Sequence, residues 1–366
     1  MNLAISALYG FAPNRRPSTE KLPDPGTPDS DASPASKSDK DSVTLGKRDA
    51  SWVTDAIAVA QFAGSGFLYN SAAKDAASER ERIPPLSNAP QVTLEDPFLI
   101  APGWTTKPDK FNDMINHLTQ DGQNGGRAVY IREGVAYSDQ ATTEATEINA
   151  NDRVFVAVYD DVLSPPDVTG PQLKDTTDMI KQAVSPKVDV LGYSMGGIAV
   201  RKMLDNGDQT VDQVAFLGTP HTGTRFAGLA DYIIRRDINF AMNMAGVNAD
   251  HLPTMAWMKM VDPKDPQSNP QLSALNASAE RQVSNTNEMI SIGSSGLATI
   301  TKPWGGTEGG DGLVQQSSLH LDGAETVVLP GRGNKQHGAL PSDTDAFIEM
   351  AKFFDWQTAE ETSASA

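Results

Sequence analysis

The sequence predicts an α/β fold with a mostly parallel central β-sheet that helices cover on both faces. Short apolar runs alternate along the chain with segments in which apolar residues recur at helical spacing. The runs are apolar at nearly every position, which is typical of parallel strands that are buried on both sides. Regular alternation of such strands with helices favours a parallel sheet.

The elements are expected in the following order. Residues 98–101 form the first buried strand, and residues 110–118 form a helix. Further strands are expected at 128–131, 154–159, 188–191 and 211–217, with helices over 175–183 and 198–204. Strands at 289–292 and 326–329 and an amphipathic helix over 345–356 complete the unit.

Composition divides the chain into four regions. Residues 1–49 are rich in Pro, Ser and Asp, and we expect a disordered tail there. Residues 50–91 form a helical N-terminal extension, as one or two helices interrupted at Gly64-Ser65-Gly66. The folded α/β domain extends over residues 92–357, and residues 358–366 form a loose C-terminal tail.

The predicted strand pattern stops over residues 225–281, which contain many methionine and aromatic side chains. We expect helices in this insertion, with a methionine-rich surface that adapts to varied apolar shapes. A small helical subdomain with an ordinary core would give the same pattern. Both interpretations remain open from the sequence.

Charge and composition exclude several classes of function. The net charge of 30 − 47 = −17 argues against binding to nucleic acid, and the absence of cysteine excludes disulfides and thiolate sites. No apolar stretch approaches the roughly 20 residues that span a bilayer. No basic residue precedes the apolar N-terminal run, so we expect a soluble protein without a standard signal peptide, either cytoplasmic or exported by a non-classical route. A short amphipathic anchor is the alternative.

The most informative motif is Gly192-Tyr193-Ser194-Met195-Gly196, between a predicted strand and a predicted helix. Such a sharp turn exposes the serine hydroxyl and directs the next backbone amide toward the same space. It also places both groups at a helix N-terminus, which favours negative charge. The sequence therefore predicts Ser194 as a nucleophile and the Met195 amide as an oxyanion donor.

A serine nucleophile needs a base and a carboxylate that orients the base. Of the five histidines, His337 lies in a loop after the last predicted strand, and Asp311 lies in a glycine-rich turn before that strand. The order Ser, Asp, His is the one expected with a Gly-x-Ser-x-Gly turn. Taken alone, Asp311 would be an ordinary turn residue and His337 a solvated loop residue.

The second oxyanion donor is expected in the loop after the first strand, where Gly103 allows the backbone amides to turn inward. We favour the amide of Trp104, with that of Thr105 as the alternative.

At these residues the chain resembles the serine-lipase branch of the α/β-hydrolase superfamily, especially bacterial triacylglycerol lipases and related esterases. The likeness covers residues 92–356 and is carried by Gly103-Trp104, the Ser194 turn, residues 218–224 (GTPHTGT), and residues 310–314 (GDGLV) followed by His337. It implies the α/β-hydrolase fold with a Ser194, Asp311, His337 triad. Such enzymes often carry a cap or lid at the position of residues 225–281, so the resemblance implies a helical cap or lid there, whose methionine-rich surface suits acyl chains. Many such lipases have histidine where this chain has Pro102, so bracing of that loop must differ.

The resemblance also implies ester hydrolysis without a cofactor or a catalytic metal, and it assigns no structural calcium. His221 matches a family position outside the triad, and we interpret it as structural. For the acyl group we expect contacts with Thr105, Tyr193, Met242, Met244 and Trp257. The expected partner is an acyl ester or lipid, with at most transient contact with a lipid surface; no nucleic acid is expected, and no protein partner is inferred.

Three other functions stay open. A phospholipase or an acyltransferase would use the same triad with a different leaving group or acceptor. An amidase or peptidase is less favoured because no charged pocket suggests peptide selection. A non-catalytic binding protein on a hydrolase fold is the alternative from a different class.

Overall fold

A computed structural model describes residues 49–207, 211–300 and 307–358. Its centre is an eight-stranded sheet with the strand order β11-β8-β7-β6-β2-β5-β3-β4. The strands are β2 (Phe98–Ala101), β3 (Ala128–Arg132), β4 (Val135–Tyr137), β5 (Val154–Ala157), β6 (Val188–Tyr193), β7 (Val211–Leu217), β8 (Glu288–Ser294) and β11 (Glu325–Leu329). All neighbours are parallel except β3 and β4, which form an antiparallel hairpin.

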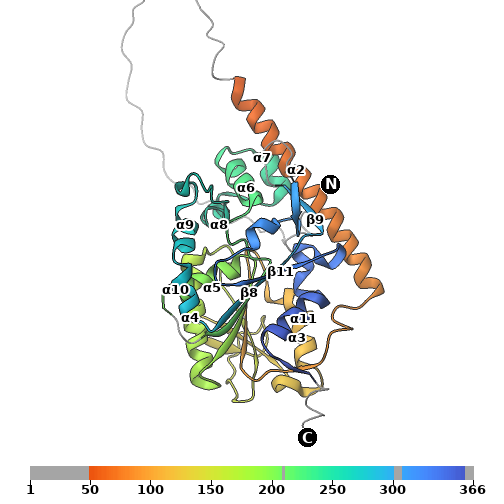
Figure 1. Cartoon of the computed structure of the whole chain (residues 1–366), viewed down its shortest axis with the longest axis vertical. Coiled ribbons are helices and arrows are strands. Elements are labelled where there is room, and N and C mark those ends of the chain that lie inside the picture. The colour runs from red at the N-terminus through yellow and green to blue at the C-terminus, as the bar shows by residue number, and fades with distance from the viewer. Residues whose placement is uncertain (1–48, 208–210, 301–306, 359–366) are drawn as a thin grey trace, which may run out of the picture.

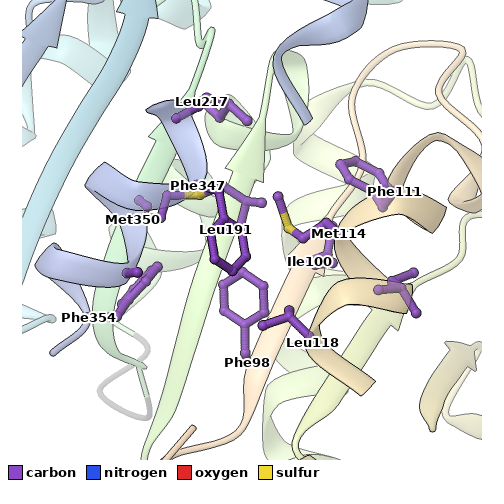
Figure 2. Close-up of a cluster of buried hydrophobic side chains, with 14 of the residues drawn as sticks. Phe98, Ile100, Phe111, Met114, Leu118, Leu191, Leu217, Phe347, Met350 and Phe354 are labelled. Atoms are coloured by element: carbon purple, nitrogen blue, oxygen red, sulfur yellow. The ribbon is translucent and has the colours of Figure 1, made fainter. Parts of the chain in front are cut away.

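Helices cover both faces of this sheet (Figure 1). On one face, α3 (Asn112–Thr119) and α11 (Thr344–Phe353) enclose an apolar core, in which Phe98 and Leu191 of the strands lie between Leu118 and Phe347 of the two helices (Figure 2). On the other face lie α4 (Pro166–Ala183), α5 (Met195–Asp205) and α10 (Ala279–Ser284). The central strands are apolar on both sides because both sides are buried.

A further helical layer lies on α5, and its apolar side chains form a separate core cluster with Trp104, Met195 and Ile198. It contains α6 (Arg225–Arg235), α7 (Asn239–Ala245), η3 (Ala249–His251), α8 (Leu252–Met258), η4 (Pro266–Ser268) and α9 (Pro270–Ala277). These helices occupy most of the stretch in which the sequence predicts an insertion. Ile233 and Met255 are fully buried within this cluster.

The N-terminal extension is one continuous helix, α2 (Asp49–Arg82), so the interruption considered at Gly64-Ser65-Gly66 does not occur. It runs along one side of the molecule (Figure 1). The ring of Phe62 stacks on Phe226 of α6 at 5.3 Å. Near the other end, Glu79 Oε2 accepts a hydrogen bond from the Asn334 amide, at 3.2 Å. The helix therefore contacts both the α6 layer and the loop that follows β11.

Each predicted strand is present, but several boundaries differ. β5 ends at Ala157, α4 begins at Pro166, α11 ends at Phe353, and the segment predicted as a helix from residue 110 begins as η1 (Pro108–Phe111). Strand β4 and two small antiparallel strand pairs are not predicted from the sequence. These pairs are β1 (Val92–Thr93) with β12 (Gln357–Thr358), and β9 (Leu297–Ile300) with β10 (Thr307–Gly310). Short strands with mixed exposure carry too little periodicity to be recognised.

The remaining elements are η2 (Gln120–Gly125), η5 (Gln316–Leu319), η6 (Gly333–Lys335) and η7 (His337–Ser342). The predicted disordered tail up to residue 48 and the C-terminal tail from residue 359 lie outside the described residues. Among the residues that are described, no helix has the length and apolar character needed to cross a bilayer.

Candidate active site

Ser194 lies at a sharp turn between β6 and α5, with backbone angles φ 54° and ψ −126°. Positive φ is strained for a residue with a side chain, and tight packing holds it here. A Cβ atom added at Gly196 would clash with the Ala101 carbonyl oxygen, and one added at Gly192 would lie 2.5 Å from Gly197 Cα. Both glycines of the motif are therefore needed for close backbone contact.

The structure brings together the three residues predicted as a triad. His337 Nε2 lies 2.9 Å from Ser194 Oγ, and His337 Nδ1 lies 2.6 Å from Asp311 Oδ2. Asp311 is buried, and its other carboxylate oxygen accepts hydrogen bonds from the amides of Leu313 at 3.0 Å and Val314 at 2.7 Å. The carboxylate is thus fixed on one side by backbone donors and faces the imidazole with the other.

Backbone contacts join the loops that carry the acid and the base. The His337 amide donates to the Asp311 carbonyl at 2.9 Å. Ser294 Oγ, at the end of β8, lies 3.0 Å from the Gly310 carbonyl oxygen and 2.8 Å from that of Lys335. Ser294 was not singled out in the sequence analysis, because a serine at a strand end carries no distinctive pattern.

The three side chains come from the turn after β6, the loop after β10 and the loop after β11, at the carboxyl edge of the parallel strands. This edge is where open α/β sheets bind ligands. The strand order, the turn that carries Ser194 and the order Ser, Asp, His along the chain all match those of an α/β-hydrolase. The chain has the α/β-hydrolase fold.

Tyr193, predicted as a substrate contact, lies on the cavity wall and also supports the base. Its hydroxyl donates to the His337 carbonyl at 2.9 Å, and its ring stacks on the imidazole with centroids 5.3 Å apart. The Tyr193 ring thus covers one face of the imidazole, while the ring nitrogens bond to Asp311 and Ser194. Tyr193 therefore has a positioning role that the sequence alone did not indicate.

The loop after β2 passes directly over the serine turn. A Cβ atom at Gly103 would lie 2.8 Å from Ser194 Cβ and 3.4 Å from the Met195 amide nitrogen. The next residue, Trp104, belongs to the same core cluster as Met195. The Thr105 amide, the alternative donor, donates to the Val162 carbonyl at 3.1 Å.

A cavity of about 260 Å³ opens over Ser194 and His337. Its other lining residues are Tyr69, Trp104, Thr105, Thr106, Lys107, Asp109, Lys110, Tyr193, Pro220, Thr224, Phe226, Met258, Leu313, Val314 and Gly338. Two of the five predicted substrate contacts, Thr105 and Tyr193, are in this lining.

The substrate contacts predicted in the insertion need correction. Met242 and Trp257 pack into the helical core cluster and do not line the cavity. Trp257 is turned away because its indole nitrogen donates to Asp167 Oδ1 at 3.2 Å. The side chain of Met244 lies outside the described residues. Phe226 and Met258 supply the apolar side chains of the insertion that do reach the cavity.

The Gly218-to-Thr224 block supports the turn. Thr219 Oγ1 donates to the Gly192 carbonyl at 3.2 Å. A Cβ atom at Gly218, where φ is 59°, would lie 3.2 Å from both Asp311 Oδ2 and His337 Nδ1. His221 is fully buried with its ring against Phe216, and burial lowers its pKa well below the usual value. His221 does not line the cavity.

A buried ion pair holds the start of the base loop. Lys335 Nζ lies 2.6 Å from Asp343 Oδ2 and 2.6 Å from Asp345 Oδ2, and Asp343 also caps α11 by accepting from the Ala346 amide. Burial alone would lower the pKa of Lys335, but the hydrogen bonds to the two carboxylates raise it overall. The loop that carries His337 is thus attached to the start of α11 through the ion pairs of Lys335.

Comparisons with solved structures give distant likenesses. The chain is similar to a gene product of Listeria innocua (16% identity, covering 73% of this chain and 96% of the other, TM-score 0.47). It is also similar to the mature form of the Bacillus licheniformis lipase BlEst2 (17%, 74% and 94%, TM-score 0.45) and to the phospholipase PlaB of Legionella pneumophila (12%, 74% and 61%, TM-score 0.46). Neither protein-family models nor curated proteins give a match.

Proposed function

We propose that the chain is a serine hydrolase that cleaves carboxylic esters through an acyl-enzyme intermediate. One observation carries the proposal: a strained, partly exposed Ser194 has its hydroxyl 2.9 Å from an imidazole that a buried carboxylate orients at 2.6 Å. An alcohol held in this way becomes nucleophilic as the imidazole takes its proton.

In the first half-reaction His337 Nε2 accepts the Ser194 proton while Oγ forms a bond to the ester carbonyl carbon. The carbonyl oxygen becomes an oxyanion, which the Met195 and Trp104 amides stabilise. The C–O bond to the alcohol then breaks, and His337 returns the proton to the leaving alkoxide. Asp311 stabilises the imidazolium that exists between these proton transfers.

In the second half-reaction water replaces the alcohol. His337 takes a proton from water as its oxygen attacks the acyl-enzyme, and the proton is returned to Ser194 Oγ as the carboxylic acid leaves. Phe226, Met258 and Val314 supply apolar surface in the cavity, which suits an acyl chain. No cofactor is required by these steps.

The test is labelling with a fluorophosphonate probe together with hydrolysis of p-nitrophenyl esters of rising acyl length. We expect one label per chain, located on Ser194, and loss of both labelling and hydrolysis in Ser194→Ala. Ser284→Ala, which removes an exposed hydroxyl on α10, is the matched control and should retain both. An unlabelled, inactive wild-type chain would instead favour a binding protein on this fold.

A further inference from the structure

Lys110 is a half-buried cation in the wall of the cavity over Ser194. It belongs to η1, which follows the Gly103-Trp104 loop. A Cβ atom added at Gly338 would lie 3.4 Å from Lys110 Nζ, and Gly338 is the residue after His337. A positive charge therefore stands beside the proposed catalytic base, on the cavity side.

The charge of Lys110 is not neutralised by a close carboxylate. Within residues 49–207, 211–300 and 307–358, no hydrogen bond or ion pair within 4.0 Å involves its ammonium group. Burial lowers the pKa of Lys110 and the positive charge of Arg80 adds to the effect, while Asp109 and Asp113 oppose it from a longer range. Since a partly desolvated cation without a partner is costly, a bound anion would stabilise this wall.

Two further polar atoms lie close to Gly338. The position that a Gly338 Cβ would occupy lies 2.8 Å from Tyr69 Oη and 3.2 Å from Gln336 Oε1, and both residues are buried. The Tyr69 oxygen takes part in hydrogen bonds with the Gln336 side chain and the Gly338 backbone. The Tyr69 hydroxyl can also donate a hydrogen bond. The Lys110 ammonium and the Tyr69 phenol therefore lie near the same space, which Gly338 leaves open because it has no side chain.

Another part of the cavity lining is apolar, while Asp109, which is exposed, adds one carboxylate to the lining. Phe226, Met258 and Val314 are apolar and come from the insertion and the Asp311 loop. An apolar region and a cationic region within one cavity fit a substrate that carries both an acyl chain and a negative charge.

We propose that the substrate is an ester bearing a phosphate or carboxylate group, and that Lys110 binds this anion with Tyr69 as a second donor. The inference rests on the proposed ester hydrolysis and specifies its substrate class. The anion forms no covalent bond; it orients the ester so that its carbonyl lies between Ser194 and the oxyanion amides. A charge-assisted contact of this kind is among the stronger hydrogen bonds in proteins.

The experiment compares, with the full chain, two pairs of esters whose members share the scissile ester and differ in whether an anionic group is attached. The first pair, 2-phosphoethyl butyrate and 2-hydroxyethyl butyrate, places the charge on the leaving alcohol. The second pair, monomethyl succinate and methyl butyrate, places it on the acyl group. Hydrolysis is followed by pH-stat, and kcat/KM is measured for each ester with wild type, Lys110→Gln, Lys110→Arg and Lys107→Gln.

In at least one pair we expect wild type to prefer the anionic ester by about tenfold, mainly through KM, and Lys110→Gln to reduce that ratio by about tenfold. Lys110→Arg should keep the preference, since it keeps the charge. Lys107→Gln removes an equal charge from an exposed position in the same cavity and should keep most of the preference for the anionic ester. The preferred pair identifies whether the anion belongs to the alcohol or to the acyl group.

Equal rates within both pairs, or a preference that survives Lys110→Gln, would overturn this inference while leaving ester hydrolysis intact. Failure of the proposed function has a different signature, because wild type would then hydrolyse none of the four esters and would resist the fluorophosphonate probe. That result would overturn both proposals.

Discussion

Tyr69 of α2 lies against Gly338, the residue that follows His337, and its oxygen is hydrogen-bonded to the Gly338 backbone. The side chain is 5% exposed, and burial raises its pKa, with the negative charge of Asp311 adding to the rise. The phenol therefore stays neutral beside the triad. A helix that precedes the sheet domain in sequence thus forms part of the wall around the base.

Replacement of Tyr69 should lower turnover through the position of the His337 loop. We expect Tyr69→Ala to reduce kcat by roughly tenfold or more, because the loop loses both a hydrogen bond and its packing partner, and Tyr69→Phe to cause a smaller loss. Steady-state kinetics on p-nitrophenyl butyrate would measure this. Tyr137→Phe, on edge strand β4, is the control, and an unaffected Tyr69→Ala enzyme would contradict the role.

Asp311→Asn should abolish most catalysis with little loss of stability. The amide oxygen can keep the contacts from the Leu313 and Val314 amides, which directs the NH2 group at His337 Nδ1 and favours the wrong imidazole tautomer. We expect kcat to fall by about 10³–10⁴. Asp311→Ala should also lower the unfolding free energy by about 1–3 kcal/mol, since it leaves buried amides unpaired. Thermal denaturation, measured together with the kinetics, distinguishes Asp311→Asn from Asp311→Ala.

Gly103→Ala should damage the site, whereas Gly64→Ala should not. The added methyl at Gly103 would lie 2.8 Å from Ser194 Cβ and from the Tyr193 carbonyl oxygen, so the oxyanion loop must move. At Gly64, inside α2, nothing lies within 4 Å of the added atom, and alanine should stabilise the helix by about 0.5–1 kcal/mol. Esterase assays and melting curves of both variants check the contrast, and full activity in Gly103→Ala would disprove the close approach.

Lys335→Met should destabilise the chain far more than Lys352→Met. The first change leaves the buried carboxylate of Asp343 without its cation and costs about 3–5 kcal/mol. The second removes an exposed pair with Glu349, for which we expect no measurable change. Urea denaturation measures both. Similar midpoints for the two variants would show that the buried pair does not hold the loop.

Asp189, near the start of β6, should make stability depend on pH. Burial raises its pKa from an ordinary value near 3.8 to about 8, and the charges of Asp96 and Asp212 add to the rise. Between these two values the folded state holds a proton that the unfolded chain has lost, so stability falls as pH rises through this window.

Asp189→Asn removes that dependence. We expect the variant to match wild type near the lower end of the window and to exceed it by on the order of 2 kcal/mol at the upper end. Asp322→Asn, at an exposed position, is the control. Denaturation at several pH values would reveal the difference, and parallel curves for wild type and Asp189→Asn would contradict the raised pKa.

The predictable parts of the molecule are those with strong local signals. Apolar strands such as Val211–Leu217 are continuous runs, and the Gly192-to-Gly196 turn has a backbone that few other sequences can adopt. The order Ser, Asp, His along the chain indicates Asp311 and His337, and in the structure His337 lies between Ser194 and Asp311, within hydrogen-bond distance of both.

The parts that could not be predicted depend on contacts between distant segments. Nothing local in Tyr69 or Ser294 indicates which loop each will meet, and η1 gave no sign that Lys110 faces the cavity. Composition alone predicts Met242 and Trp257 in the cavity. An apolar side chain in a helical layer can face either the cavity or the interior of the layer, and composition does not distinguish the two. Phe226 and Met258 line the cavity instead.

The unbroken course of α2 makes its rotational register part of the site. Asp55 near one end meets Tyr232 of α6, and Glu79 near the other meets the loop before His337. Inserting a single residue between Phe62 and Tyr69 would rotate everything beyond it by about 100°. Tyr69 and Glu79 would then both turn away from the His337 loop, although neither is adjacent to His337 in sequence. Every side chain of the triad would still be present.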